Sequence, residues 1–420
     1  MNNTITRSST NGPQKRRLSV RTRMMLAAQQ RIENYAELVS VKKTNAGENG
    51  EMAAGTKIEK NLPYPSVTMQ DSKISDELKT KITKVVEACC AGESEEIWKR
   101  KSKSKASYGT AVLDLSGLNI GYGGALHVFN EIHDWDSSHI VKMDFSGCSL
   151  DERGMSVVYR IVKLCKNIKE LNLSRNNLGR SGITWVAKLL QNTEICFLML
   201  PHNGLNDRDM EVFLAALPDS DTILSLDLSY NILGPYVGEL MTKYMPVSSI
   251  RSLNLSHNEV GPEGVRYMIE GLQENDSLLE LDLSWNYLYD KGMASIADII
   301  LTVPLLKKIS LNGNFISEVG AQCLAQSLRD NFSLEVFNLA QNFIRSQGAC
   351  ALVRAIRSNS GSKLRLMDIN GTLVSQEFTM MYRKMQMDNE GFEVTGFCVI
   401  GDDGGHFRGR KSSKIHSSSV

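Results

Sequence analysis

The 420-residue sequence lacks several features that mark common functional classes. It has no run of eighteen apolar residues, which excludes a transmembrane helix of ordinary length. Its first thirty residues lack the apolar core of a secretory signal. Eight cysteines are scattered without a framework spacing, and seven histidines are dispersed without the spacing of a zinc site. We therefore expect reduced thiols, a cytoplasmic location, no metal and no cofactor.

Charge and catalytic motifs are equally sparse. The formal net charge is +1, so no global field selects a nucleic acid or a membrane as partner. The stretch "GHFRGRKS" approximates a phosphate-binding loop, but Arg410 stands where the motif requires lysine. No nucleophile elbow or Cys/His pairing is recognisable. The sequence thus predicts a protein that is not an enzyme.

What the sequence does contain is a repeat. The segments "LNLSRNNL", "LMLPHNGL", "LDLSYNIL", "LNLSHNEV", "LDLSWNYL", "ISLNGNFI" and "FNLAQNFI" place an asparagine at one fixed position, every 27 or 28 residues. A cysteine fills this position in "MDFSGCSL", and degraded copies lie at 113–120 and 367–374. The ladder positions, as we call them, are Cys148, Asn176, Asn203, Asn231, Asn258, Asn286, Asn314 and Asn342. We expect these residues to satisfy buried turn groups rather than to perform chemistry.

The second half of each repeat is predicted to be helical. A glycine recurs six residues after most ladder positions and is followed by apolar residues at helical spacing, as at Gly320, Leu324 and Leu328. Asp209 and Val237 replace this glycine in two repeats, so their helices should begin differently. A short strand, a turn and a helix every 28 residues predict an α/β solenoid of about ten repeats.

The motif "LDLSWNYLYDKG" resembles the ribonuclease-inhibitor-like class of leucine-rich repeats. Within this class, "LRLMDINGTLVSQEF" is similar to the leucine-rich repeat-containing protein 74 family. The resemblance implies a horseshoe arc with a parallel sheet on its concave face, helices on its convex face, and protein binding without catalysis. Two alternatives remain open: a GTPase regulator resembling the Ran GTPase-activating proteins, and a cytoskeletal or ciliary component.

Two groups of side chains are candidate contacts for a protein partner. The residue before the ladder position is large and planar in five consecutive repeats and glycine in several flanking ones; we call the five the central row: Arg175, His202, Tyr230, His257 and Trp285. Tyrosine, tryptophan and arginine are favoured anchors of protein interfaces. A second group, the rim group, follows the ladder position: Tyr287, Phe315 and Phe343.

The ends of the chain differ from the repeats in composition. We expect a disordered basic region at 1–70, a helical cap and basic linker at 71–108, repeats at 109–388, a closing strand at 389–401 and a basic Ser-rich tail at 402–420. "RRLS" makes Ser19 a candidate phosphorylation site. The same Arg-rich start also allows a mitochondrial transit peptide, which is the less favoured location. The terminal Val420, with Ser418, fits a ligand of PDZ domains.

Overall fold

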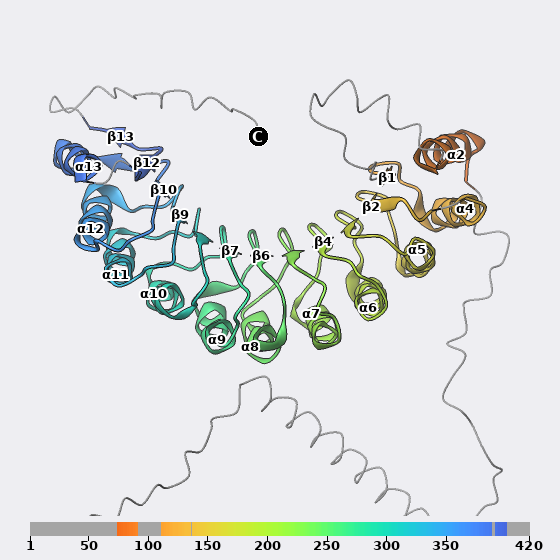
Figure 1. Ribbon diagram of the computed structural model, residues 1–420, viewed down its shortest axis with the longest axis horizontal. Helices are drawn as coiled ribbons and strands as arrows, with labels where there is room; N and C mark the ends of the chain where they lie inside the picture. The colour runs from red at the N-terminus through yellow and green to blue at the C-terminus, as the bar shows by residue number, and fades with distance from the viewer. Residues whose placement is uncertain (1–73, 91–110, 136, 389–390, 401–420) are drawn as a thin grey trace, which may run out of the picture. The chain divides into compact units, whose positions relative to one another are not determined.

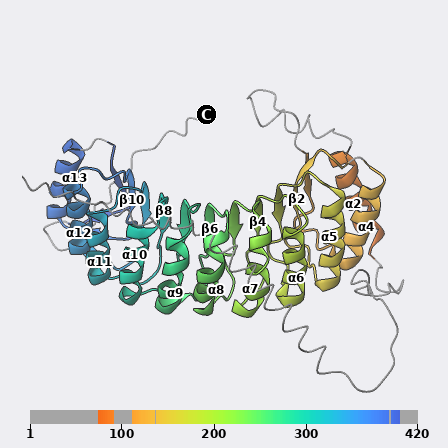
Figure 2. The same ribbon diagram turned by 60° about the horizontal axis from the view of Figure 1, so that its bottom comes forward.

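The computed structural model describes residues 74–90, 111–135, 137–388 and 391–400. Within them the chain alternates strand and helix, and successive repeats follow an arc with the strands on its inner side and the helices on its outer side (Figures 1 and 2). The predicted solenoid fold is thereby confirmed. No described helix is both long enough and apolar enough to cross a membrane.

One parallel sheet of eleven strands lines the inner side, and each of its strands pairs with the strand of the next repeat. Register advances by one repeat at every step, so Leu253 lies beside Leu281 and Leu281 beside Ile309. The strands are β1 (Ala111–Asp114), β2 (Ile140–Asp144), β3 (Glu170–Asn172), β4 (Phe197–Met199), β5 (Ser225–Asp227), β6 (Ser252–Asn254), β7 (Glu280–Asp282), β8 (Lys308–Ser310), β9 (Val336–Asn338), β10 (Leu366–Asp368) and β12 (Glu393–Thr395).

The helices stack against each other in chain order. They are α2 (Asp76–Cys90), α4 (Gly121–His133), α5 (Glu152–Leu164), α6 (Gly179–Leu190), α7 (Asp207–Leu214), α8 (Tyr236–Tyr244), α9 (Gly261–Gln273), α10 (Met293–Thr302), α11 (Glu318–Leu328), α12 (Arg345–Ser358) and α13 (Gln376–Asp388). Short 3-10 turns precede or follow some of them, at Leu217–Asp219, Met245–Val247 and Asp290–Gly292.

The core lies between the sheet and the helices. The repeated leucines point into it, and Leu281, Leu283 and Leu288 are at most 1% exposed. Each fully buried leucine contributes about 1.5–3 kcal/mol, and the stacking of repeats makes this core continuous from α2 to β12.

The expected difference in the two repeats without the helical glycine is only partly found, because α5 and α11, whose repeats keep the glycine, also begin after a side-chain cap as α7 does. Helix α7 starts at Asp207 with a capping box, in which Asn206 accepts from the backbone N–H of Asp209 and Asp209 accepts from that of Asn206. Helix α8 starts at Tyr236 directly after Pro235. By contrast, α6 and α9 start closer to their ladder asparagines, at Gly179 and Gly261.

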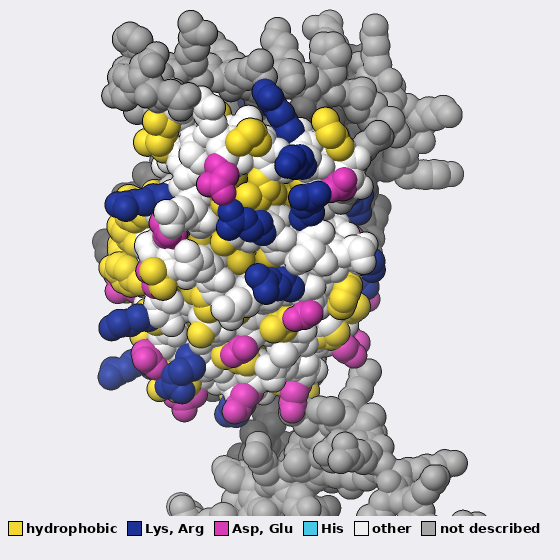
Figure 3. Space-filling view, turned by 90° about the vertical axis from the view of Figure 1, so that its left-hand side faces the viewer, with side chains coloured by type: hydrophobic (Ala, Val, Ile, Leu, Met, Phe, Trp, Pro, Cys, Tyr) yellow, Lys and Arg dark blue, Asp and Glu magenta, His cyan; other side chains and the backbone are white. Residues whose placement is uncertain are grey.

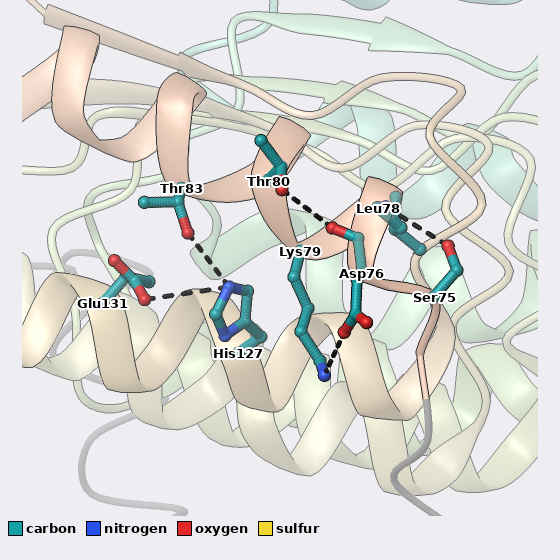
Figure 4. Close-up of polar contacts among 8 residues, drawn as sticks. All are labelled: Ser75, Asp76, Leu78, Lys79, Thr80, Thr83, His127 and Glu131. Carbon is teal, nitrogen blue, oxygen red and sulfur yellow. Dashed lines mark hydrogen bonds and ion pairs between the residues drawn. The ribbon is translucent and has the colours of Figure 1, made fainter.

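Helix α2 packs on α4 and covers the first repeat, as Figure 4 shows. The hydroxyl of Ser75 accepts from the N–H of Leu78, and Thr83 Oγ1 lies 3.1 Å from His127 Nε2 of α4. The buried face consists of Ile82, Val86 and Cys89. The neighbouring Val85 is only half-buried.

At the other end, the structure has two short strands where we expected one closing strand at 389–401. The segment is divided into β12, which joins the main sheet, and β13 (Cys398–Val399), which pairs with β11 (Leu373–Val374). The division occurs at Gly396, whose φ of +79° turns the chain out of the strand. Ion pairs from Arg354 to Glu377 and from Arg357 to Asp388 join α12 to α13. Figure 3 shows this end, where cationic side chains lie among apolar ones.

Candidate functional site

The ladder asparagines form one hydrogen-bonded series through the inside of the repeats. The side-chain N–H of each donates to the strand-end carbonyl of the preceding repeat, at 2.8–3.1 Å. For Asn286 this acceptor is Leu255, and its side-chain oxygen accepts from the N–H of Val260. All seven are buried. Each asparagine therefore joins two repeats where the strands end.

Cys148 makes fewer bonds in the same position. Its thiol donates to the carbonyl of Leu115 at 3.2 Å, which corresponds to the bond that the asparagines make. A thiol offers one weak donor, whereas an amide has two donors and an acceptor oxygen. Burial raises the pKa of the Cys148 thiol to about 12, so the group is an uncharged structural residue rather than a nucleophile.

A second series of buried asparagines escaped the sequence reasoning. Asn275, Asn331 and Asn359 lie just after helices α9, α11 and α12. Their side chains donate to helix-end carbonyls of the preceding repeat: Asn275 to Met245, Asn331 to Ile300 and Asn359 to Leu328. The only signal in the sequence was an amide at multiples of 28 residues outside the leucine motif.

The central row occupies a special backbone conformation. All five of its residues have φ between +55° and +59°, in the left-handed region. Gly117, Gly147, Gly313 and Gly371 occupy the same position in flanking repeats, also with positive φ. Glycine adopts this conformation freely, whereas a residue with a Cβ loses about 1 kcal/mol or more. The central repeats therefore carry large side chains where the backbone favours none.

Four members of the central row form a stack of rings. The ring centroids of His202 and Tyr230 are 4.3 Å apart, those of Tyr230 and His257 4.0 Å, and those of His257 and Trp285 5.5 Å. Interplanar angles are 18°, 11° and 13°. These separations follow the spacing of adjacent strands, about 4.8 Å. Because the rings face one another, their edges form the outer surface, and Tyr230 and Trp285 remain 45% and 43% exposed.

The stack ends on a glycine. A Cβ added to Gly313 would lie 2.4 Å from the Trp285 ring, so the indole covers the next repeat's backbone. Arg175, at the other end, is exposed and donates its backbone N–H to the carbonyl of Pro201. The structure thus brings four of the five predicted residues into ring contact and places Arg175 one repeat before them.

The stack lies at the carboxyl ends of the strands. The backbone N–H of Trp285 donates to the carbonyl of Asn312, and that of Tyr230 donates to the carbonyl of Ser256. Backbone hydrogen bonds between repeats therefore continue beyond the ends of the strands. Burial between the neighbouring rings lowers the pKa of His257, the Asp282 carboxylate acts in the opposite direction, and His202 lowers it further. The net effect favours the uncharged form of the His257 imidazole.

The rim group also comes together in the structure. Phe315 lies between Tyr287 and Phe343, with centroid distances of 6.1 and 6.0 Å, and Tyr289 joins at 5.4 Å. The four rings are 39–61% exposed. Tyr287, Tyr289 and Phe315 also have positive φ, a cost that burial does not offset.

The last residue of most strands is an aspartate or asparagine, and its side chain has a partly structural role. In most repeats the side-chain oxygen of this last residue accepts from the N–H two residues later, as Asp227 does from Ser229 and Asp282 from Ser284. This Asx turn ends the strand. Asn172 and Asn254 make the same bond with an uncharged amide.

Other predicted features cannot be placed. Ser19 and Val420 both lie outside the described residues. Within the described ranges, no group of three or more His, Cys, Asp or Glu side chains could hold a metal ion.

Comparison with known proteins agrees with the repeat pattern. The family model described as Leucine Rich repeat matches residues 164–184, 248–268 and 274–297. The Protein phosphatase 1 regulatory subunit 37 homolog of Caenorhabditis elegans is 24% identical over 161 residues, which cover 37% of this chain and 17% of that protein. Protein NLRC5 of Homo sapiens is 28% identical over 138 residues, which cover 33% and 7% respectively. The alignments thus span only a small part of each relative.

Among solved structures, the crystal structure of the Rad7 and Elc1 complex in yeast covers 93% of this chain and 95% of the matched chain, at 12% identity and a TM-score of 0.44. A score below 0.5 carries no argument, so the assignment depends on the other observations. The sequence repeats, the register of the parallel sheet and the matched family model together show that the chain has the fold of a leucine-rich repeat solenoid.

Proposed function

We propose that this chain is a non-enzymatic interaction scaffold that binds a protein partner through the central row. The observation that carries the proposal is the ring stack. Four consecutive repeats hold rings in a backbone conformation that favours glycine, and two of those rings stay more than two-fifths exposed. Nothing in the fold requires this, because flanking repeats keep the same conformation with glycine. Exposed aromatic side chains at strained backbone positions are typical of a binding surface.

Two resemblances support the same function. The name of the worm relative describes a regulatory subunit of protein phosphatase 1, a protein that acts on another protein. The similarity to the leucine-rich repeat-containing protein 74 family also favours a scaffold, and the rim group would extend the contact surface toward the C-terminal repeats.

The proposal is tested by replacing Tyr230 or Trp285 with glycine. Glycine suits the left-handed backbone better than alanine does, so it separates partner binding from folding. The full chain and both variants are used to capture and cross-link partner proteins, and the amount of partner that each form retains is quantified. Each variant should lose about 1–3 kcal/mol of binding. Unfolding should change little, because relief of strain offsets the lost stacking of about 0.5–1.5 kcal/mol per pair.

Gln341→Gly is the matched control, since Gln341 occupies the same position with a φ of +57° outside the stack. It should retain partners as the wild type does. Partner retention that is equal in all variants would place the binding site elsewhere.

A further inference from the structure

The strands beside the ring stack carry carboxylates that the fold does not require. Asp227 of β5 and Asp282 of β7 lie three residues before Tyr230 and Trp285. Each uses one oxygen for the Asx turn, at 2.9 and 2.8 Å. Asn172 and Asn254 show that an uncharged amide makes the same turn. The negative charge is therefore an addition to the structural role.

The ion pairs of the described residues leave these two carboxylates aside. Among the described residues, neither Asp227 nor Asp282 forms an ion pair with a lysine or arginine. The nearby acid Glu280, by contrast, lies 3.4 Å from Lys308. A carboxylate on a partly exposed surface with one oxygen uncommitted can accept from an incoming donor without breaking a bond.

The charge of the surrounding repeats acts in the same direction. Residues 201–300 contain sixteen aspartates and glutamates against five lysines and arginines, a formal charge of −11, although the whole chain is at +1. The preceding repeats differ in sign, since residues 151–190 contain eight basic and three acidic residues. Negative formal charge is thus concentrated in the repeats that hold most of the ring stack.

We infer that the central face takes a basic, arginine-containing segment of a partner protein. This inference rests on the proposed function, because it assigns a partner class to the same surface. A guanidinium suits the surface better than an ammonium does, because its planar fork presents several donors in a fixed geometry to a carboxylate and is more weakly hydrated. Phe197, 43% exposed, and Met199 of β4 extend the surface with apolar contacts for neighbouring side chains of the segment.

The experiment uses the full chain and a fluorescein-labelled twelve-residue peptide of alternating arginine and leucine, followed by fluorescence anisotropy. Peptides with lysine or glutamate in place of arginine are compared. The arginine peptide should bind, the lysine peptide more weakly and the glutamate peptide not at all. Binding of the arginine peptide should weaken as salt is raised.

The deciding variant is Asp227→Asn with Asp282→Asn, which keeps both Asx turns. It should lower the affinity for the arginine peptide about tenfold, since each exposed charge pair contributes up to about 1 kcal/mol. The matched control, Asp276→Asn with Asp298→Asn, removes the same charge from exposed positions outside the sheet and should change the affinity less than about twofold.

Equal losses in the two double variants would overturn the inference, because attraction would then depend on net charge alone. An unchanged affinity in Asp227→Asn with Asp282→Asn, or no binding of the arginine peptide to the wild type, would also overturn it. The proposed function would survive either result if Trp285→Gly still releases captured proteins, and it would fail separately if Trp285→Gly retains them.

Discussion

The repeats around Cys148 and the repeats from Asn176 to Trp285 have the same strand register but fill two turn positions differently. Before the ladder position, the first group has Gly117 and Gly147 and the second has the central row. The backbone conformation is the same, with φ of +62° at Gly147 and +57° at Trp285. The comparison teaches that the turn needs the conformation and not the side chain.

At the ladder position itself the requirement is the opposite. Leu118 and Cys148 occupy it in the first group, and the Cys148 side chain donates one bond where that of Asn231 donates several. Here the side chain is part of the fold, because it satisfies groups that no backbone partner reaches. The two positions are adjacent in sequence, yet one serves stability and the other is available for binding.

The largest expected effect comes from removing every hydrogen-bonding group at the ladder position of a central repeat, which leaves fewer side-chain bonds there than Cys148 makes in its own repeat. Asn286→Ala removes the bonds to the carbonyls of Leu255 and Ser284 and to the N–H of Val260. The N–H of Val260 is left buried and unpaired, whereas the carbonyls of Leu255 and Ser284 keep only their bonds from Asn258 and His257. We expect a loss of about 1–3 kcal/mol in the free energy of unfolding. Denaturant unfolding measures it.

Asn286→Cys should lose less, since a thiol restores the bond to the preceding repeat as Cys148 does with Leu115. Gln273→Ala, an exposed amide at the end of α9, is the control and should be near neutral. If the unfolding midpoint of Asn286→Ala in denaturant equals that of the control, the ladder asparagines do not have the proposed structural role.

Sequence reasoning predicted the strand, turn and helix of each repeat because one 28-residue pattern fixes them together. It did not predict the positive φ of the central row, because five large residues at this position hide the conformation that Gly147 and Gly313 reveal. It likewise placed one closing strand at 389–401, since the turn at Gly396 depends on β12 and β13 pairing with different strands. Local pattern determines the repeat, whereas contacts between repeats determine its exceptions.

A smaller effect should distinguish the glycine that follows the ring stack, Gly313, from a glycine of the first group, Gly117. Gly313→Ala and Gly117→Ala both place a Cβ at positive φ, at a cost of about 1 kcal/mol. The Gly117 Cβ meets nothing within 4 Å, whereas the Gly313 Cβ meets the Trp285 ring at 2.4 Å. Gly313→Ala should therefore lose about 1 kcal/mol more in unfolding free energy, as the ring is displaced. In Trp285→Gly the two alanine variants should become equivalent, and a persistent difference would contradict the ring contact.

The smallest expected effect is a pH dependence confined to the stack. His257 lies between Tyr230 and Trp285 and faces Asp282 and His202, and its folded-state pKa is lowered chiefly by burial. The unfolded chain has the higher pKa, about 6.5, so it binds the proton first as pH falls. His257 should thus reduce stability progressively as pH falls from above 6.5 toward the lowered folded pKa, and no further below it. His257→Gln, which uses the side chain found at Gln341, removes this titration. Unfolding midpoints measured between pH 8 and pH 5 should therefore fall less in the variant than in the wild type. Parallel curves would show that the stacked imidazole is not held uncharged by its neighbours.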